Sequence, residues 1–151
     1  MFEYDTYKTK DTPLAIKKVR ELPNFIANSS DEVCNYMIKH YNLDEKTEEF
    51  LYAIYCKSSR EVIGICEISR GAVNGSIISP AEIMKRALLL NAPIILLTHN
   101  HPRGRTKPSS DDIKVTKQTS QAANLLGLQL TDHIIVGGED VFTSMLDEGL
   151  M

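Results

Sequence analysis

The sequence predicts an α/β (α+β) domain in which a mixed β-sheet is flanked by helices. Residues 93–98 form a short, continuous apolar run, which is typical of a strand covered on both faces. Helix-start signals stand on either side of this run, at Ser79-Pro80 and at Ser109-Ser110. β-branched and aromatic residues favour two strands further upstream, within 49–69. Because helices must cover a sheet, this alternation indicates a layered domain.

The expected elements follow the chain in a simple order. Residues 1–28 are predicted to form one or two extended segments, and Ser30-Asp31 can begin a helix that continues to Tyr41. The remaining elements are strands at 49–56 and 61–69 joined by a turn at 57–60, a helix from 80, a strand at 93–98, a helix at 110–126, a strand at 128–136, and a turn at 137–140 that leads into 141–143.

The two later helices carry explicit end signals. Ser79 can cap the first of them, Pro80 fits its first helical position, Glu82 can close a capping box, and Asn91 can end it. Gly127 can end the second. We expect 1–151 to form one domain.

Composition places the chain among ordinary globular proteins. Of its 151 residues 42% are hydrophobic and 25% are charged, and the net charge of −3 gives no electrostatic case for wrapping nucleic acid. Three cysteines without a Cys-x-x-Cys pair indicate free thiols and a reducing compartment. With no apolar run of membrane-spanning length and no secretion-type start, we expect a cytoplasmic protein that does not use a membrane.

The strongest functional signal is a set of three metal-ligand residues. His99 and His101 directly follow the buried strand, and residues i and i+2 of an extended chain point to the same side, with Asn100 turned away. Asp112 lies in the first turn of the next helix, where the helix dipole favours a carboxylate. Two imidazoles and one carboxylate are the open ligand set of catalytic zinc, in which a water completes the site. Ser109 and Asp112 alone would be an ordinary capping box, and capping is compatible with ligation.

The pattern His99-x-His101, seven residues, Ser109, two residues, Asp112 resembles the JAMM motif of MPN-domain metalloproteases. The strings His99-Asn100-His101-Pro102-x-Gly104 and Asp132-His133-Ile134-Ile135-Val136 are similar to the bacterial RadC-like branch, traditionally labelled as DNA-repair proteins. The likeness covers roughly 46–151 and is weak over 1–45. It implies a three-layer, cytidine-deaminase-like domain. The chain differs at Arg103, where that branch commonly has Ser.

The resemblance also implies a role for each matching position. His99, His101 and Asp112 would hold one Zn²⁺ with a bound water, and Ser109 would donate a hydrogen bond to the oxyanion. An upstream Glu would act as general base. Glu67 is the favoured candidate because it lies mid-strand between apolar residues, with Glu61 and Glu82 as alternatives.

Two further features of the sequence each allow two interpretations. His133 is either a partner of a zinc ligand or a packed strand residue. The cations at 103, 105 and 107 either meet an anionic substrate or form a solvated loop.

The implied activity is a zinc metallopeptidase that hydrolyses a peptide or isopeptide bond in a peptide or protein substrate. The alternatives are a metal-dependent nuclease associated with DNA repair and a non-catalytic interaction module.

Overall fold

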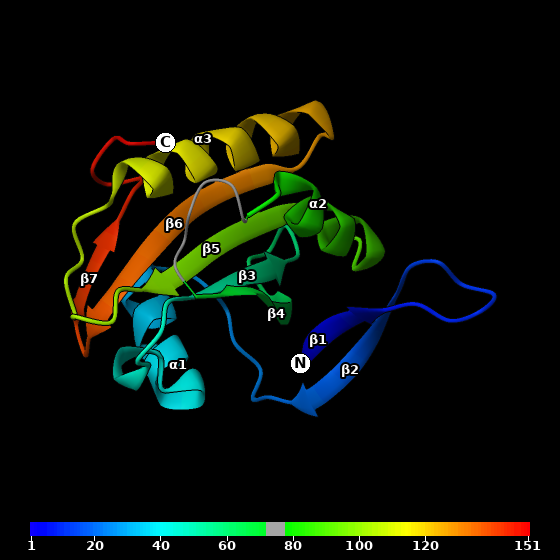
Figure 1. Cartoon of the computed structure of the whole chain (residues 1–151), viewed down its shortest axis with the longest axis horizontal. Helices are drawn as coiled ribbons and strands as arrows, with labels where there is room; N and C mark the ends of the chain where they lie inside the picture. Colours follow the sequence, from blue (N-terminus) through cyan, green and yellow to red (C-terminus); the bar gives the residue numbers. More distant parts are fainter. Residues whose placement is uncertain (72–77) are drawn as a thin grey trace.

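The computed structural model describes residues 1–71 and 78–151. Three α-helices and a short 3-10 helix accompany the strands of one sheet in this part of the chain (Figure 1). In chain order the elements are β1 (Phe2–Tyr7), β2 (Ala15–Glu21), α1 (Ser30–Tyr41), η1 (Leu43–Glu45), β3 (Phe50–Cys56), β4 (Val62–Arg70), α2 (Pro80–Leu89), β5 (Ile94–Asn100), α3 (Ser110–Leu125), β6 (Gln129–Gly138) and β7 (Val141–Ser144).

The strands form a single mixed sheet in the order β2-β1-β4-β3-β5-β6-β7. β5 runs parallel to β6, and β1 runs parallel to β4, whereas the other neighbours are antiparallel. The apolar run predicted as a covered strand is β5, which lies between β3 and β6 with most of its residues buried. The predicted α/β class and mixed sheet are confirmed.

Helices cover both faces of this sheet. α1 packs against β6 and β7 on one face, whereas α2 and α3 pack together on the other (Figure 1). Side chains alternate along each strand, so neighbouring residues enter different cores. In β3, Tyr52 and Ile54 join the core on the α1 face, whereas Leu51 and Ala53 join the core under α2 and α3.

The helix ends agree with the sequence in part. Asn91 and Gly127 both have positive φ, 51° and 71°, and stop α2 and α3 as expected. The prediction of a capping box at the start of α2 is wrong. The Ser79 side chain makes no capping hydrogen bond, and the Glu82 carboxylate pairs with Lys85 instead. Lys85 and Arg86 have taken the place of the Ser79 amide as the partners of Glu82.

The three cysteines, Cys34, Cys56 and Cys66, are buried free thiols. Burial raises the pKa of Cys34 to about 11 and that of the other two to about 12, so they are thiols at neutral pH. Within the described ranges, no helix combines the length and the apolar character that a membrane crossing requires.

Candidate metal centre

Two adjoining elements bring the three predicted ligands together. His99 is the penultimate residue of β5, and His101 follows its last residue. Asp112 is in the first turn of α3 and is 1% exposed. The odd-numbered residues of β5, Ile95 and Leu97, enter the core under α3, so His99 faces the same side as Asp112. The alternation that buries the strand therefore aims the imidazole at the helix start.

The two imidazole nitrogens and the Asp112 carboxylate lie about as far apart as the ligands of one tetrahedral ion. His99 Nε2 lies 3.0 Å from His101 Nε2 and 3.2 Å from Asp112 Oδ1, and His101 Nε2 lies 3.4 Å from Asp112 Oδ2. Nitrogen and oxygen ligands of tetrahedral zinc, each about 2.0–2.1 Å from the ion, stand about 3.3 Å from one another. Asp112 Oδ1 is buried and accepts no hydrogen bond, an arrangement that a cation would satisfy. The three residues could hold one metal ion.

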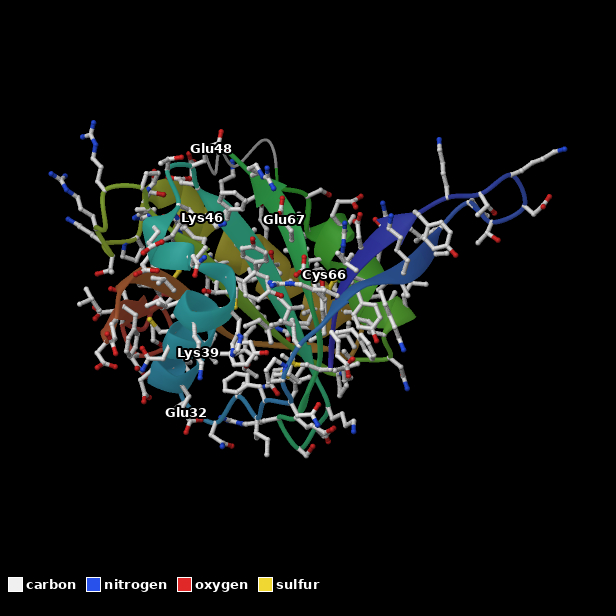
Figure 2. The ribbon with its side chains drawn as sticks, turned by 90° about the horizontal axis from the view of Figure 1, so that it is seen from below. Glu32, Lys39, Lys46, Glu48, Cys66 and Glu67 are labelled. Atoms are coloured by element: carbon white, nitrogen blue, oxygen red, sulfur yellow. The ribbon has the colours of Figure 1, made fainter. Side chains whose placement is uncertain are left out.

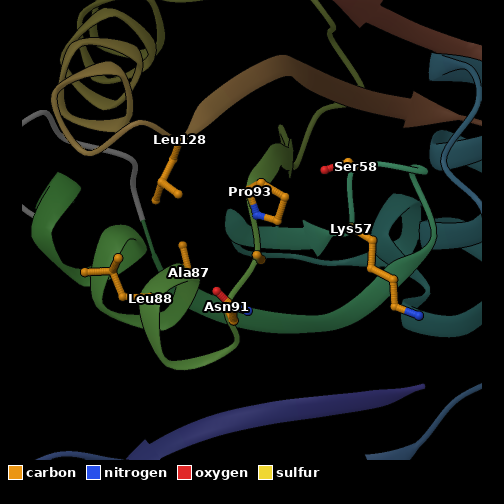
Figure 3. Close-up of a pocket in the computed structure, with 8 residues that line it drawn as sticks. Lys57, Ser58, Ala87, Leu88, Asn91, Pro93 and Leu128 are labelled. Atoms are coloured by element: carbon orange, nitrogen blue, oxygen red, sulfur yellow. The ribbon is translucent and has the colours of Figure 1, made fainter.

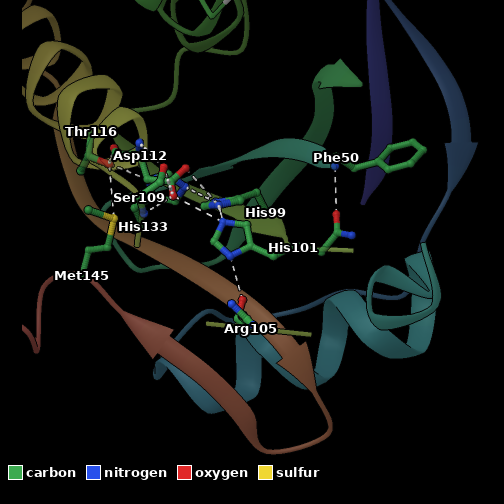
Figure 4. A network of polar contacts seen from close by, with 10 residues as sticks. Phe50, His99, His101, Arg105, Ser109, Asp112, Thr116, His133 and Met145 are labelled. Carbon is green, nitrogen blue, oxygen red and sulfur yellow. Dashed lines mark hydrogen bonds and ion pairs between the residues drawn. The ribbon is translucent and has the colours of Figure 1, made fainter. Parts of the chain in front are cut away.

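A buried relay of polar contacts links Thr116, His133 and His99 (Figure 4). Thr116 Oγ1 lies 2.6 Å from both the backbone oxygen of Asp112 and His133 Nδ1, and 3.4 Å from Met145 Sδ. With its one hydroxyl hydrogen on the Asp112 oxygen, Thr116 accepts from His133 Nδ1–H. His133 Nε2 is then the acceptor for His99 Nδ1–H at 2.8 Å, which leaves the lone pair of His99 Nε2 facing Asp112. Complete burial lowers the pKa of His133 well below its ordinary value and keeps it neutral. Of the two interpretations of His133, the structure supports the one in which it is a hydrogen-bond partner of a candidate ligand, His99.

The second imidazole is oriented by the loop that follows it. His101 Nδ1 lies 2.7 Å from the backbone oxygen of Arg105, which makes Nδ1 the donor and Nε2 the free lone pair. Contact with Asp112 raises the pKa of His101, and the carboxylate of Glu49 adds to this shift. Burial alone would raise the pKa of Asp112, but contacts with both imidazoles and with Ser109 hold it well below its usual value. The carboxylate is therefore ionised, as a ligand must be.

Ser109 lies at the edge of this cluster and is exposed. The capping box predicted for α3 is present: the Asp112 amide donates to Ser109 Oγ, and the Ser109 amide donates to Asp112 Oδ2. The Ser109 hydroxyl also donates to Asp112 Oδ2 at 2.7 Å. One oxygen of Asp112 thus serves the cap, while the other is left to the candidate metal position.

Glu67 is not brought to the ligands, and we correct the predicted general base on this ground. In β4 it lies opposite Tyr52 of β3, whose ring belongs to the core on the α1 face, and it lines a cavity there with Tyr41. Figure 2 labels Glu67 and its neighbour Cys66 on β4. Its neighbour Cys66 is the one that faces α2 and α3. The sheet therefore stands between the Glu67 carboxylate and His99. The two alternative general bases are not near the candidate ligands either. Glu61 pairs with Lys57 and Glu82 pairs with Lys85, and neither lines the cleft beside His101.

A different acid, Glu49, lies on the ligand side. Leu51 is the partner of His99 across β3 and β5, and Glu49 precedes it by two residues. Its half-buried side chain lines a cleft of about 490 Å³ together with His101 and Ser109. Sequence reasoning missed Glu49, although an acid at the start of a strand that pairs with the His-x-His strand was a signal that could have found it.

Asn100, between the two histidines, holds the backbone on both sides of Glu49. Its Oδ1 accepts from the Phe50 amide at 2.9 Å, a contact drawn as a dashed line at Phe50 in Figure 4. Its Nδ2 donates to the Glu48 oxygen at 3.0 Å. The side chain is 1% exposed and points away from the ligands, as the alternation predicts. The His-Asn-His triplet therefore supplies two candidate ligands and also anchors the segment that carries the nearby acid.

These two hydrogen bonds of Asn100, a structural clamp on the backbone around Glu49, lead to a prediction about stability. We expect Asn100→Ala to lower the free energy of unfolding by about 1–3 kcal/mol, because the buried Phe50 amide loses its acceptor. Asn35→Ala, which removes an exposed contact with Asp140, is the control and should cost less than about 1 kcal/mol. Urea unfolding measures both. Equal losses would show that Asn100 is not a structural clamp.

The relay makes a prediction about metal affinity. Thr116→Val removes the acceptor for His133, so we expect zinc affinity to fall on the order of tenfold, as for other partners of metal ligands. Thr119→Val is a matched control, because Thr119 is also buried in α3 but its hydroxyl has no hydrogen-bond partner. Competition with a chromogenic chelator measures both variants. Equal affinities would contradict the relay.

A separate cavity of about 360 Å³ lies at the opposite end of β5, where α2 ends and Pro93 directly precedes the strand (Figure 3). Among the described residues its lining is mostly apolar and aliphatic, and Lys57 is the one ionisable side chain there. It lacks the convergent polar groups of a catalytic site, so the chemistry is expected at the cleft beside His101.

Comparison with known proteins identifies the family of the chain. A family model described as the RadC-like JAB domain matches residues 27–150, a range that includes all three ligands, Ser109 and Glu49. The chain belongs to the RadC-like JAB domain family. The match begins upstream of the motif-bearing part and takes in α1.

Curated relatives in this family extend the comparison. The chain is 36% identical over 123 residues to a UPF0758 protein of Clostridium acetobutylicum, which covers 82% of this chain and 52% of the relative. A UPF0758 protein of Methanosarcina acetivorans is 31% identical over 136 residues, covering 87% of this chain and 59% of the relative. The chain thus spans about half the length of the curated relatives it matches.

Proposed function

We propose that this RadC-like JAB domain is a zinc-dependent hydrolase that cleaves a peptide or isopeptide bond. The observation that carries the proposal is that the His99 and His101 nitrogens lie 3.0 Å apart and 3.2 and 3.4 Å from the two oxygens of Asp112, beside an open cleft that Glu49 and Ser109 also line. Three protein ligands leave one tetrahedral position, which is the arrangement of catalytic zinc sites. When bound, such an ion lowers the pKa of a water molecule to about 7 and polarises a carbonyl oxygen.

The residues around the ligands divide the remaining work. Glu49, on the β3 side of the cleft, accepts a proton from the attacking water and returns it to the leaving amine. Ser109 donates its hydroxyl hydrogen to the developing oxyanion once this hydrogen leaves Asp112 Oδ2, its present acceptor. Asn100 keeps the Glu49 backbone in place, and His133 keeps the His99 lone pair directed at Asp112.

A metal-dependent nuclease is the second candidate, and the cations of the loop at Arg103, Arg105 and Lys107 favour it. Against it, the ligand set contains one carboxylate, whereas many nucleases use carboxylate-rich sites with two metals. The hydrolysis of amides is the better match to two imidazoles, one carboxylate and a nearby Glu.

The test compares the zinc-loaded protein with protein treated with a chelator. Both are incubated with a peptide library, an isopeptide-linked substrate, and single- and double-stranded DNA. We expect cleavage of an amide substrate that disappears with the chelator and returns with zinc. DNA cleavage that requires Glu49, without cleavage of any amide, would overturn the proposal in favour of the nuclease.

A further inference from the structure

We propose that the cleft beside His101 selects peptide segments that carry carboxylates near the scissile bond. The inference rests on the proposed hydrolase function and names its substrate class. It starts from the three cations of the loop after β5, Arg103, Arg105 and Lys107, which all line the same cleft as His101, Ser109 and Glu49.

The loop that carries these cations is tied to the candidate metal centre. The His101 imidazole donates to the Arg105 oxygen, and the Gly104 amide donates to the His101 oxygen at 2.8 Å. The loop also packs closely on β6, since a Cβ at Gly137 would lie 2.7 Å from the Gly104 oxygen and from a methyl group of Thr106. These contacts hold the loop backbone at a defined position beside the ligands, so its charges are presented to the substrate that the ligands meet.

The cations are available for a ligand. All three side chains are exposed, and none forms an ion pair with another residue in the described ranges. They also stand out from the rest of the chain. Of its 17 Lys and Arg residues these three leave 14, against 20 Asp and Glu, so the remainder of the molecule is acidic. An anionic ligand is therefore attracted to this cleft and repelled by the bulk of the protein.

The observations favour a peptide over a nucleic acid as the source of the negative charge. Proteins that bind DNA through its backbone commonly neutralise about 6–10 phosphates, more than three cations can reach. Single-stranded nucleic acid is held by stacking on aromatic rings, and apart from the His101 imidazole no aromatic side chain lines the cleft in the described residues. Glu49, on the β3 side, disfavours a further carboxylate at the scissile bond itself and so places the acidic residues of the substrate toward the loop.

The test measures binding separately from cleavage. Zinc-loaded Glu49→Gln protein is titrated with fluorescent peptides of one sequence that carry either two Glu or two Gln beside the central bond, and with a fluorescent oligonucleotide. The cleft variant replaces Arg103, Arg105 and Lys107 by Gln. Its matched control replaces Lys8, Lys10 and Lys17 by Gln, the same change in charge at exposed positions on the β1–β2 hairpin.

We expect the acidic peptide to bind about tenfold more tightly than the neutral one at about 50 mM salt, since exposed ion pairs contribute modestly and are screened as salt rises. The cleft variant should lose this preference and the hairpin control should keep it. Equal affinity for both peptides, or tighter binding of the oligonucleotide, would overturn the inference. Zinc-dependent cleavage without a charge preference would sink this inference alone, and a charge preference without cleavage by the wild type would sink the hydrolase proposal alone.

Discussion

Glu49→Gln is expected to lower kcat for an amide substrate by about 10²–10⁴-fold, the usual contribution of a positioned general base. Zinc content should stay at the wild-type level, because Glu49 lines the cleft without belonging to the three ligands. The amide of Gln keeps the size of the side chain and removes its ability to accept a proton at neutral pH. Metal analysis and steady-state kinetics on the same preparation separate the two effects.

Glu67→Gln is the control for this prediction. Glu67 is on the α1 face, paired with Arg70, so its loss should change kcat less than about twofold. The reverse pattern, with Glu67→Gln inactive and Glu49→Gln active, would restore the first prediction for the general base and contradict the placement described above.

The two acids show what the sequence can and cannot reveal about this site. The histidines and Asp112 were found because their geometry is local: a strand's alternation pairs i with i+2, and a capping box has fixed spacing. Glu49 meets them only through the pairing of β3 with β5, which opposes Leu51 to His99 across some 50 residues of chain. The position of Glu49 at the start of a predicted strand was visible in the sequence, but it becomes a signal only once that strand is known to pair with the His-x-His strand, and this pairing depends on the whole sheet.

The prediction of Glu67 as the general base failed for a related reason. A Glu between apolar residues in a strand faces one of two sides, and the sequence does not say which side carries the site. Here Cys66 and Ile68 pack under α2 and α3, so Glu67 faces α1. The elements themselves were easier to predict. Burial of β5 and the ends of α2 and α3 follow from residue type, whereas the sheet order does not.

Loss of a ligand is expected to have the second large effect, and Asp112→Asn is the sharpest test. Asn keeps the shape of Asp112 and still offers an oxygen to the Ser109 amide, so the α3 cap survives while the ligand charge is lost. Removing a partner of a ligand costs about 10–100-fold in metal affinity, so removing the ligand itself should weaken zinc binding by more than about 100-fold. Asp111→Asn, one residue earlier in the same helical turn, is the matched control and should bind zinc as the wild type does.

Stability reports the same event without any substrate. An ion that binds only the folded chain adds about 2.7 kcal/mol at 100 times its Kd, which raises Tm by about 5–10 °C for a domain of this size. Wild type and Asp111→Asn should show this rise on adding zinc, and Asp112→Asn should not. A rise in all three proteins would mean that zinc binds elsewhere. The absence of a rise in the wild type would contradict zinc binding and would remove the metal from the mechanism. Asp112 Oδ1 would then be a buried acceptor that no ion satisfies.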